Sequence, residues 1–137
     1  MRRFAVIFAL FLLVIVGILG LQLFASESGE VVVVTTHGSD GEPFSTRLWV
    51  IDKNGAPWLR AGSMKSTWYQ RLLENPQIEV RRGEHAFTAL SVPRPEFQQR
   101  INDSMVEKYG GADKFIGLLF GRGNSIPIEL IVDSNDR

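Results

Sequence analysis

The sequence predicts a mainly β domain with helices (α+β), preceded by one N-terminal transmembrane helix. Three observations lead to this prediction. The chain begins with a long uncharged apolar run, and β-branched or apolar segments then alternate with turn residues over residues 31–92. Large apolar side chains at four-residue spacing between Glu96 and Tyr109 are typical of an amphipathic helix. We expect about six strands in a small barrel, with the helices packed outside it.

The apolar run extends from Phe4 to Phe24 and contains no charged side chain. As a helix it would be roughly 31 Å long, which is about the thickness of the hydrocarbon core of a bilayer. Arg2 and Arg3 precede the run and acidic residues follow it, so the positive-inside rule predicts a cytoplasmic N-terminus and an extracytoplasmic domain. The alternative is a cleaved signal peptide, whose apolar region would be shorter. We expect an uncleaved single-pass anchor over residues 1–26 and one domain over residues 27–137.

Composition excludes several classes of function. The chain has no cysteine, so disulfides and thiolate metal sites are ruled out. It has 15 basic and 15 acidic residues, and without Arg2 and Arg3 the net charge is −2, which does not favour nucleic acid as a partner. His37 and His85 are far apart and lack a nearby ligand pattern, so we expect no metal site. No hydrolase or P-loop motif and no favoured pair of acidic residues is present, so the catalytic residues stay unassigned.

The first half of the domain contains three predicted strands. Residues 31–36 form a β-branched run typical of a buried strand, and residues 44–51 resume as a strand after a run of turn residues. The sequence Lys53-Asn54-Gly55 indicates a hairpin turn, with residues 57–62 as the returning strand. We expect these three strands to form an antiparallel meander.

The second half mixes helices and strands. A helix capped by Ser66 or Thr67 would end at Asn75-Pro76. Two short strands should follow at residues 77–82 and 85–92. The amphipathic helix then ends at Gly110-Gly111. A short helical segment over residues 114–120 and a last strand over residues 126–132 complete the domain.

Candidate anion-binding groups gather at strand ends. Ser45-Thr46-Arg47 begins the second strand, while Arg60, Ser63, Lys65 and Ser66 surround the end of the third strand and the start of the next helix. A helix start offers free N–H groups and a partial positive charge. If Arg47 lies beside Lys65, two cations and several hydroxyls converge on a phosphate-sized spot. The alternative is that Arg60 is solvated and that Ser66 only caps its helix.

Two stretches resemble a known superfamily. Residues 35–50 (TTHGSDGEPFSTRLWV) and 60–80 (RAGSMKSTWYQRLLENPQIEV) are similar to the flavin-binding split β-barrel proteins. These include pyridoxamine-phosphate-oxidase-like proteins and deazaflavin-dependent nitroreductases and quinone reductases. The matching features are the Gly-x-Pro turn, the S-x-K-like turn, and a helix that ends in Asn-Pro before an alternating strand.

The resemblance implies a six-stranded antiparallel split β-barrel that binds FMN or an F420-type deazaflavin by its phosphate, often in a homodimer. Thr46 and Arg47 would approach the phosphate, and Ser63, Lys65 and Ser66 would complete the grip. The implied activity is a membrane-anchored oxidoreductase that passes hydride to a small organic acceptor.

The resemblance also has a departure, because Asp40 replaces a positive charge that many relatives carry in the first turn. A non-catalytic ligand-binding or assembly module on the same barrel is therefore the alternative. Haem binding comes third and would need an axial ligand such as His37 or His85. Trp49, Trp58 and Trp68 are further candidates to stack on a cofactor ring, or else core or dimer contacts.

Overall fold

The computed structural model describes residues 2–27 and 29–136, and within the first helix it describes the side chains of residues 6–18. The helices are α1 (Arg2–Glu27), α2 (Thr67–Glu74), α3 (Gln98–Tyr109) and α4 (Gly111–Phe120), with short 3₁₀ turns η1 (Pro95–Phe97) and η2 (Ser134–Asp136). The strands are β1 (Val31–His37), β2 (Pro43–Trp49), β3 (Ile51–Lys53), β4 (Ala56–Ala61), β5 (Gln77–Arg82), β6 (His85–Pro93) and β7 (Ile126–Val132).

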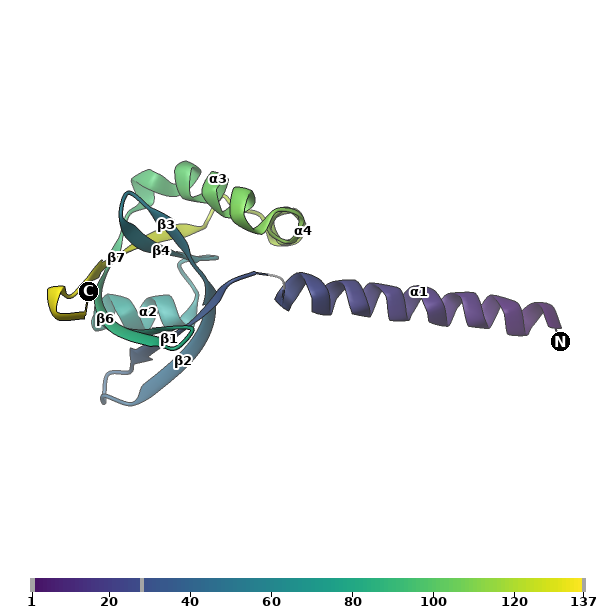
Figure 1. Cartoon of the computed structure of the whole chain (residues 1–137), viewed down its shortest axis with the longest axis horizontal. Helices are drawn as coiled ribbons and strands as arrows, with labels where there is room; N and C mark the ends of the chain where they lie inside the picture. Colours follow the sequence, from purple (N-terminus) through teal and green to yellow (C-terminus); the bar gives the residue numbers. More distant parts are fainter. Residues whose placement is uncertain (1, 28, 137) are drawn as a thin grey trace.

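The strands form one antiparallel sheet with the order β2-β1-β5-β6-β7-β4-β3, and Figure 1 shows that this sheet curls into a half-barrel. The sheet has seven strands, so the prediction of six is wrong. The extra strand arises because the expected second strand stops at Val50 and divides into β2 and β3.

Tyr109 explains the break at Val50. The Val50 N–H donates to the Tyr109 hydroxyl oxygen over 3.0 Å, and that hydroxyl lies 2.9 Å from the Val50 carbonyl oxygen. The backbone groups of Val50 are therefore satisfied by a side chain instead of a neighbouring strand, and the chain can change direction there.

The predicted meander is also wrong. β1 pairs with β2 and with β5, whereas β4 pairs with β3 and with β7. β2 and β3 therefore lie at opposite edges of the sheet, although only Val50 separates them in sequence. The expected β3–β4 hairpin is present, with Asn54 at φ 54° and Gly55 at φ 76°. These positive φ angles are the ones that an Asn-Gly hairpin turn requires.

Two apolar clusters hold the domain together. α2 lies within the curl of the sheet (Figure 1) and buries Trp68, Tyr69 and Leu72 there. Leu73 of the same helix is 49% exposed. α3 covers the outside of β3 and β4 and forms the second cluster, whose buried members are Ile51, Trp58, Ile101, Met105 and Tyr109.

Helix α1 is continuous and extends away from the barrel in Figure 1. The side chains described along it, from Val6 to Ile18, are all exposed. Among the residues that the structure describes, no helix combines the length and apolar character of a membrane span. The transmembrane anchor therefore receives no support here and stays a prediction.

Candidate functional site

The two predicted ligands on β2 point to opposite faces of the sheet. Thr46 pairs with the buried Val34 and faces the barrel interior, whereas Arg47 pairs with Val33 and faces outward. Arg47 is exposed and Thr46 is half-buried. Only Arg47 therefore lies on the side of the strand that α3 and α4 cover.

The turn between β4 and α2 holds the other predicted ligands. The Ser63 hydroxyl accepts a hydrogen bond from the Lys65 backbone N–H over 3.2 Å, and the Ser63 carbonyl accepts the Ser66 N–H over 3.2 Å. Ser66 occupies the N-cap position of α2 without a side-chain capping bond. Ser63 thus has a structural role in shaping the turn, which presents the exposed Lys65 side chain to solvent.

Between β2 and β4, bordered by α3 and α4, lies an open cavity of about 220 Å³. Arg47 and Trp49 border it from β2, and Arg60 borders it from β4. The remaining walls come from Leu48, Gly62, Met105, Ile116 and Arg122. The cavity thus joins two residues singled out from the sequence, Arg47 and Arg60. Gly62 brings the beginning of the turn before α2 to the same place.

Asp113 of α4 binds two of the arginines at the cavity. Arg60 forms an ion pair with Asp113 Oδ1, and Arg122 Nη2 lies 2.5 Å from the same oxygen. The Arg60 and Asp113 side chains are only 5% and 1% exposed. Arg60 Nη1 also donates to Asn102 Oδ1 over 3.2 Å, which ties β4 to α3. Arg60 is therefore buried and paired, so the interpretation of a solvated side chain is wrong.

The ion pairs leave an excess of positive charge at the cavity. Arg60 and Arg122 share a single carboxylate, and Arg47 adds a third guanidinium. Burial, followed by the charge of Arg60, lowers the pKa of Arg122. Within the part of the chain that the structure describes, the buried Arg122 Nε has no hydrogen-bond partner. These features favour an anionic group in the cavity.

Of the three tryptophans, only Trp49 borders this cavity. Trp49 stacks on Tyr109 with ring centroids 4.4 Å apart and an interplanar angle of 9°. Trp58 is 2% exposed and packs on Phe97, while Trp68 is 8% exposed in the barrel core. Trp58 and Trp68 are therefore core residues, and Trp49 is the candidate for contact with a ligand.

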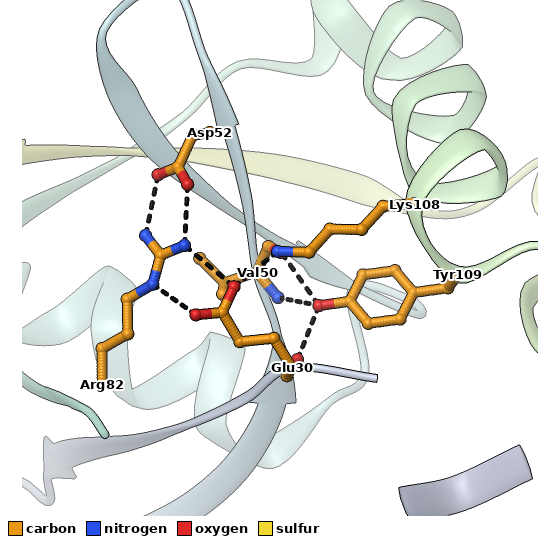
Figure 2. A network of polar contacts seen from close by, with 6 residues as sticks. All are labelled: Glu30, Val50, Asp52, Arg82, Lys108 and Tyr109. Carbon is orange, nitrogen blue, oxygen red and sulfur yellow. Dashed lines mark hydrogen bonds and ion pairs between the residues drawn. The ribbon is translucent and has the colours of Figure 1, made fainter. Parts of the chain in front are cut away.

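A polar network at the end of the barrel was not predicted (Figure 2). Arg82 of β5 binds Glu30 through Nε and Nη2 at 2.7 and 2.8 Å, and it binds Asp52 of β3 through both Nη atoms at 2.8 and 2.7 Å. Lys108 Nζ lies 2.6 Å from Glu30 Oε1 and 2.8 Å from the Val50 carbonyl. The network therefore joins the residue before β1, the Val50 carbonyl, strands β3 and β5, and the end of α3.

The charges in this network stabilise one another. Hydrogen bonds from Arg82 and Lys108 lower the pKa of Glu30 to about 2, and the Arg82 bond lowers the pKa of Asp52. The same two carboxylates raise the pKa of Arg82. Burial raises the pKa of the Tyr109 hydroxyl, which lies 2.6 Å from the Glu30 carbonyl oxygen. The network therefore ties together segments that are distant in sequence.

The two histidines lie apart. His37 ends β1 and borders a depression of about 660 Å³ over β5 and β6, together with Asn75, Gln77 and Leu90. His85 is exposed at the start of β6 and pairs with Arg82. Only His37 therefore adjoins a space that a flat ligand could enter.

Solved structures provide a comparison with known proteins. An F420-H2 dependent reductase (FDR-A) is 21% identical, with a TM-score of 0.58 over 73% of this chain and 93% of that chain. The haem storage protein HutZ from Vibrio cholerae is 14% identical, with a TM-score of 0.61 over 84% and 89%. A FAD-binding protein from Mesorhizobium loti is 11% identical, with a TM-score of 0.57 over 80% and 84%.

No protein-family model and no curated protein sequence matches the chain. The structural neighbours are less than 25% identical, so the similarity identifies the fold. That fold is a curled antiparallel split β-barrel with helices, and the barrel fold implied by the sequence resemblance is confirmed.

Proposed function

We propose that the domain binds an FMN- or F420-type cofactor at the cavity between β2 and β4 and acts as an oxidoreductase on a small organic acceptor. The observation that carries this proposal is the placement of Arg47, Arg60 and Trp49 around one cavity at the seam of the half-barrel. The fold supports a flavin-type cofactor, since similar structures include an F420-H2 dependent reductase and a FAD-binding protein.

The residues present fit such a cofactor. Its phosphate is an anion, and the cavity carries more guanidinium than carboxylate charge. Its ring is flat and aromatic, and Trp49 offers an aromatic surface already held in place by Tyr109. The predicted ligands Ser63, Lys65 and Ser66 follow Gly62 directly and are available to extend the grip outward.

The cavity is small for a whole cofactor. Its volume of about 220 Å³ is below the range of roughly 300–1,000 Å³ that is usual for small-molecule sites. A single chain would therefore enclose the phosphate-bearing part and leave the ring partly uncovered. A second copy of the chain would complete the site, in line with the predicted homodimer.

The cofactor and the protein would make different contributions to the reaction. The bound cofactor would supply the hydride chemistry. Arg47 and Lys65 would hold its anionic end, and Trp49 would orient the ring and exclude water. The lining residues Arg47, Arg60 and Trp49 would contribute position and charge.

Titration of the full-length chain in detergent tests this function. We expect micromolar binding of FMN or of the F420-type cofactor, with at least a tenfold loss of affinity in Arg47→Ala and in Lys65→Ala. Arg100→Ala is the matched control, because Arg100 is equally cationic but exposed on α3, over the Phe97 ring. If a folded chain binds neither cofactor, or if the control loses as much affinity as the test variants, the proposal fails.

A non-catalytic ligand-binding or assembly module is the second candidate. Asp113 favours it, because this carboxylate already neutralises part of the charge of Arg60 and Arg122. The module predicts that Lys65→Ala changes no cofactor affinity, because no cofactor binds. The titration therefore separates the two candidates.

Haem binding is supported by the fold of HutZ and by the depression beside His37. Titration with haemin would then give a Soret band that shifts in His37→Ala and not in His85→Ala. Absence of a saturable Soret change in the unsubstituted chain would exclude this use of the barrel.

We further propose that the N-terminal segment attaches the chain to a membrane, with its N-terminus cytoplasmic and its domain extracytoplasmic. The uncharged run over residues 4–24 and the preceding arginines support this topology. Because the chain lacks cysteine, Glu42→Cys in the exposed β1–β2 turn provides a unique label site. A membrane-impermeant thiol reagent should label it in intact expressing cells, and labelling only after lysis would contradict the topology.

A further inference from the structure

Helix α4 has an inverted amphipathic character. Its acidic residue, Asp113, is 1% exposed, whereas Leu118 and Phe120 are 83% and 81% exposed. Phe115 and Leu119 are also more than half exposed, at 52% and 59%. A surface helix normally turns its charged side outward and its apolar stripe inward. Here the acidic side chain is inside, while four large apolar side chains and Lys114 are exposed.

The barrel itself cannot cover this apolar face. Asp113 fixes the inner side of α4 through its ion pairs with Arg60 and Arg122, whose side chains come from β4 and from the loop after α4. Turning the helix to bury Phe120 would break these ion pairs, and breaking a buried pair costs about 3–5 kcal/mol. The outward orientation of the four apolar side chains is therefore built into the fold. A contiguous exposed apolar patch of this kind marks a contact surface.

The position of α4 indicates what the partner is. α4 lies at the end of the domain from which α1 departs, and the two helices are neighbours (Figure 1). The described side chains of α1, from Val6 to Ile18, are apolar and exposed as well. One apolar phase at this end of the molecule would cover both helices together. Lys114, exposed on α4, could reach from such a contact to a polar headgroup.

We propose that α4 is an interfacial helix that lies on a lipid bilayer, with Phe115, Leu118, Leu119 and Phe120 at the boundary between headgroups and acyl chains. This proposal rests on the membrane attachment proposed above. Helices of this kind bind through a buried apolar face without crossing the membrane. Ile116, on the same helix, borders the cavity between β2 and β4 that Arg47, Arg60 and Arg122 also border (the arginine cavity). This cavity would therefore lie close to the bilayer surface.

Site-directed spin labelling of the full-length chain tests the proposal. Single nitroxide labels at Leu118→Cys and Phe120→Cys report on α4, and a label at Leu12→Cys reports on α1. Leu90→Cys is the matched control, because Leu90 is an apolar side chain that is 45% exposed on β6, beside the depression over β5 and β6. The chain is reconstituted in vesicles of phosphatidylcholine and phosphatidylglycerol. Accessibility of each label to oxygen and to a water-soluble nickel chelate is then measured.

We expect the α4 and α1 labels to be more accessible to oxygen than to nickel, and the Leu90→Cys label to show the reverse. If the α4 labels are more accessible to nickel while the α1 label is more accessible to oxygen, the α4 proposal is overturned and the anchor stands. Water-like labels on both helices would overturn both proposals. Dipolar broadening at Leu118→Cys that disappears on dilution with unlabelled chain would show a second copy on α4, and it would equally overturn the lipid contact.

Discussion

The Tyr109 hydroxyl serves three backbone groups, the N–H and carbonyl of Val50 and the carbonyl of Glu30. Tyr109→Phe keeps the ring stacked on Trp49 but leaves a buried N–H without its acceptor. We expect a loss of about 1–3 kcal/mol in the free energy of unfolding, measured by denaturant titration. Gln99→Ala on the exposed face of α3 is the control. A change below about 0.5 kcal/mol would show that the hydroxyl does not support the break between β2 and β3.

Glu30 makes stability depend on pH. Its folded pKa is lowered to about 2 from 4.5 by hydrogen bonds from Arg82 and Lys108. Because the folded pKa is depressed, the stabilisation is fully present above pH 4.5 and is lost as pH falls through about 2. The free energy of unfolding, measured by denaturant titration at several pH values in this window, should therefore depend less on pH in Glu30→Gln than in the unsubstituted chain. Parallel curves would contradict the assignment.

The contacts of individual residues were the hardest feature to predict from the sequence. Arg47 was predicted as an anion-binding residue because it lies at the start of a strand after a turn. Arg60 was predicted because it lies near the end of a strand. Asp113 and Arg82 were missed, since their partners are distant in sequence and no local pattern marks them. Tyr109 was predicted only as the last apolar residue of a helix, yet with Lys108 it completes the network in Figure 2.

At the scale of elements, α4 depends on one buried carboxylate. Asp113→Asn keeps the shape but leaves the Arg60 guanidinium, which is 5% exposed, without its counter-charge. We expect a loss of about 3–5 kcal/mol in unfolding free energy, or local release of α4 detected as faster amide exchange over residues 111–120. Asp103→Asn on the exposed side of α3 is the control. Unchanged stability together with unchanged exchange would refute this role.

The β3–β4 hairpin gives a second prediction for an element. Gly55 adopts φ 76°, a conformation that side chains with a Cβ rarely take. Gly55→Ala should cost about 1 kcal/mol in unfolding free energy, although nothing lies within 4 Å of the added Cβ. Gly62→Ala, with equally open space and no positive φ, is the matched control. Equal effects of the two substitutions would show that the backbone angle is not the cause.

Most elements could be predicted, because periodicity and turn residues are local signals. The last strand occupies residues 126–132 as expected, and the Asn54-Gly55 turn is where its sequence places it. Strand pairing could not be predicted in the same way. The run over residues 44–51 looks continuous, and only the distant Tyr109 reveals that Val50 interrupts it.

For the whole molecule, the curl of the sheet creates the candidate site. Because β2 and β3 lie at the two ends of one sheet, the curl brings β2 close to β4 and leaves Arg47 and Arg60 beside a common cavity. The sequence resemblance pointed to Thr46, Arg47 and the turn before α2, of which only Arg47 borders the cavity, and it did not indicate that α4 borders it. Ile116 and Arg122 line the cavity and Asp113 pairs with Arg122, and all three residues lie beyond residue 92, where the resemblance weakens.

The central claim is that the arginine cavity grips the phosphate of a flavin-type cofactor. Comparing the affinities of FMN and riboflavin tests it most directly, because riboflavin lacks only the phosphate. We predict that the full-length chain binds FMN at least tenfold more tightly, a difference of about 1.4 kcal/mol, and that Arg47→Ala removes most of this preference. Equal affinity for the two flavins, or a preference that survives in Arg47→Ala, would contradict the account.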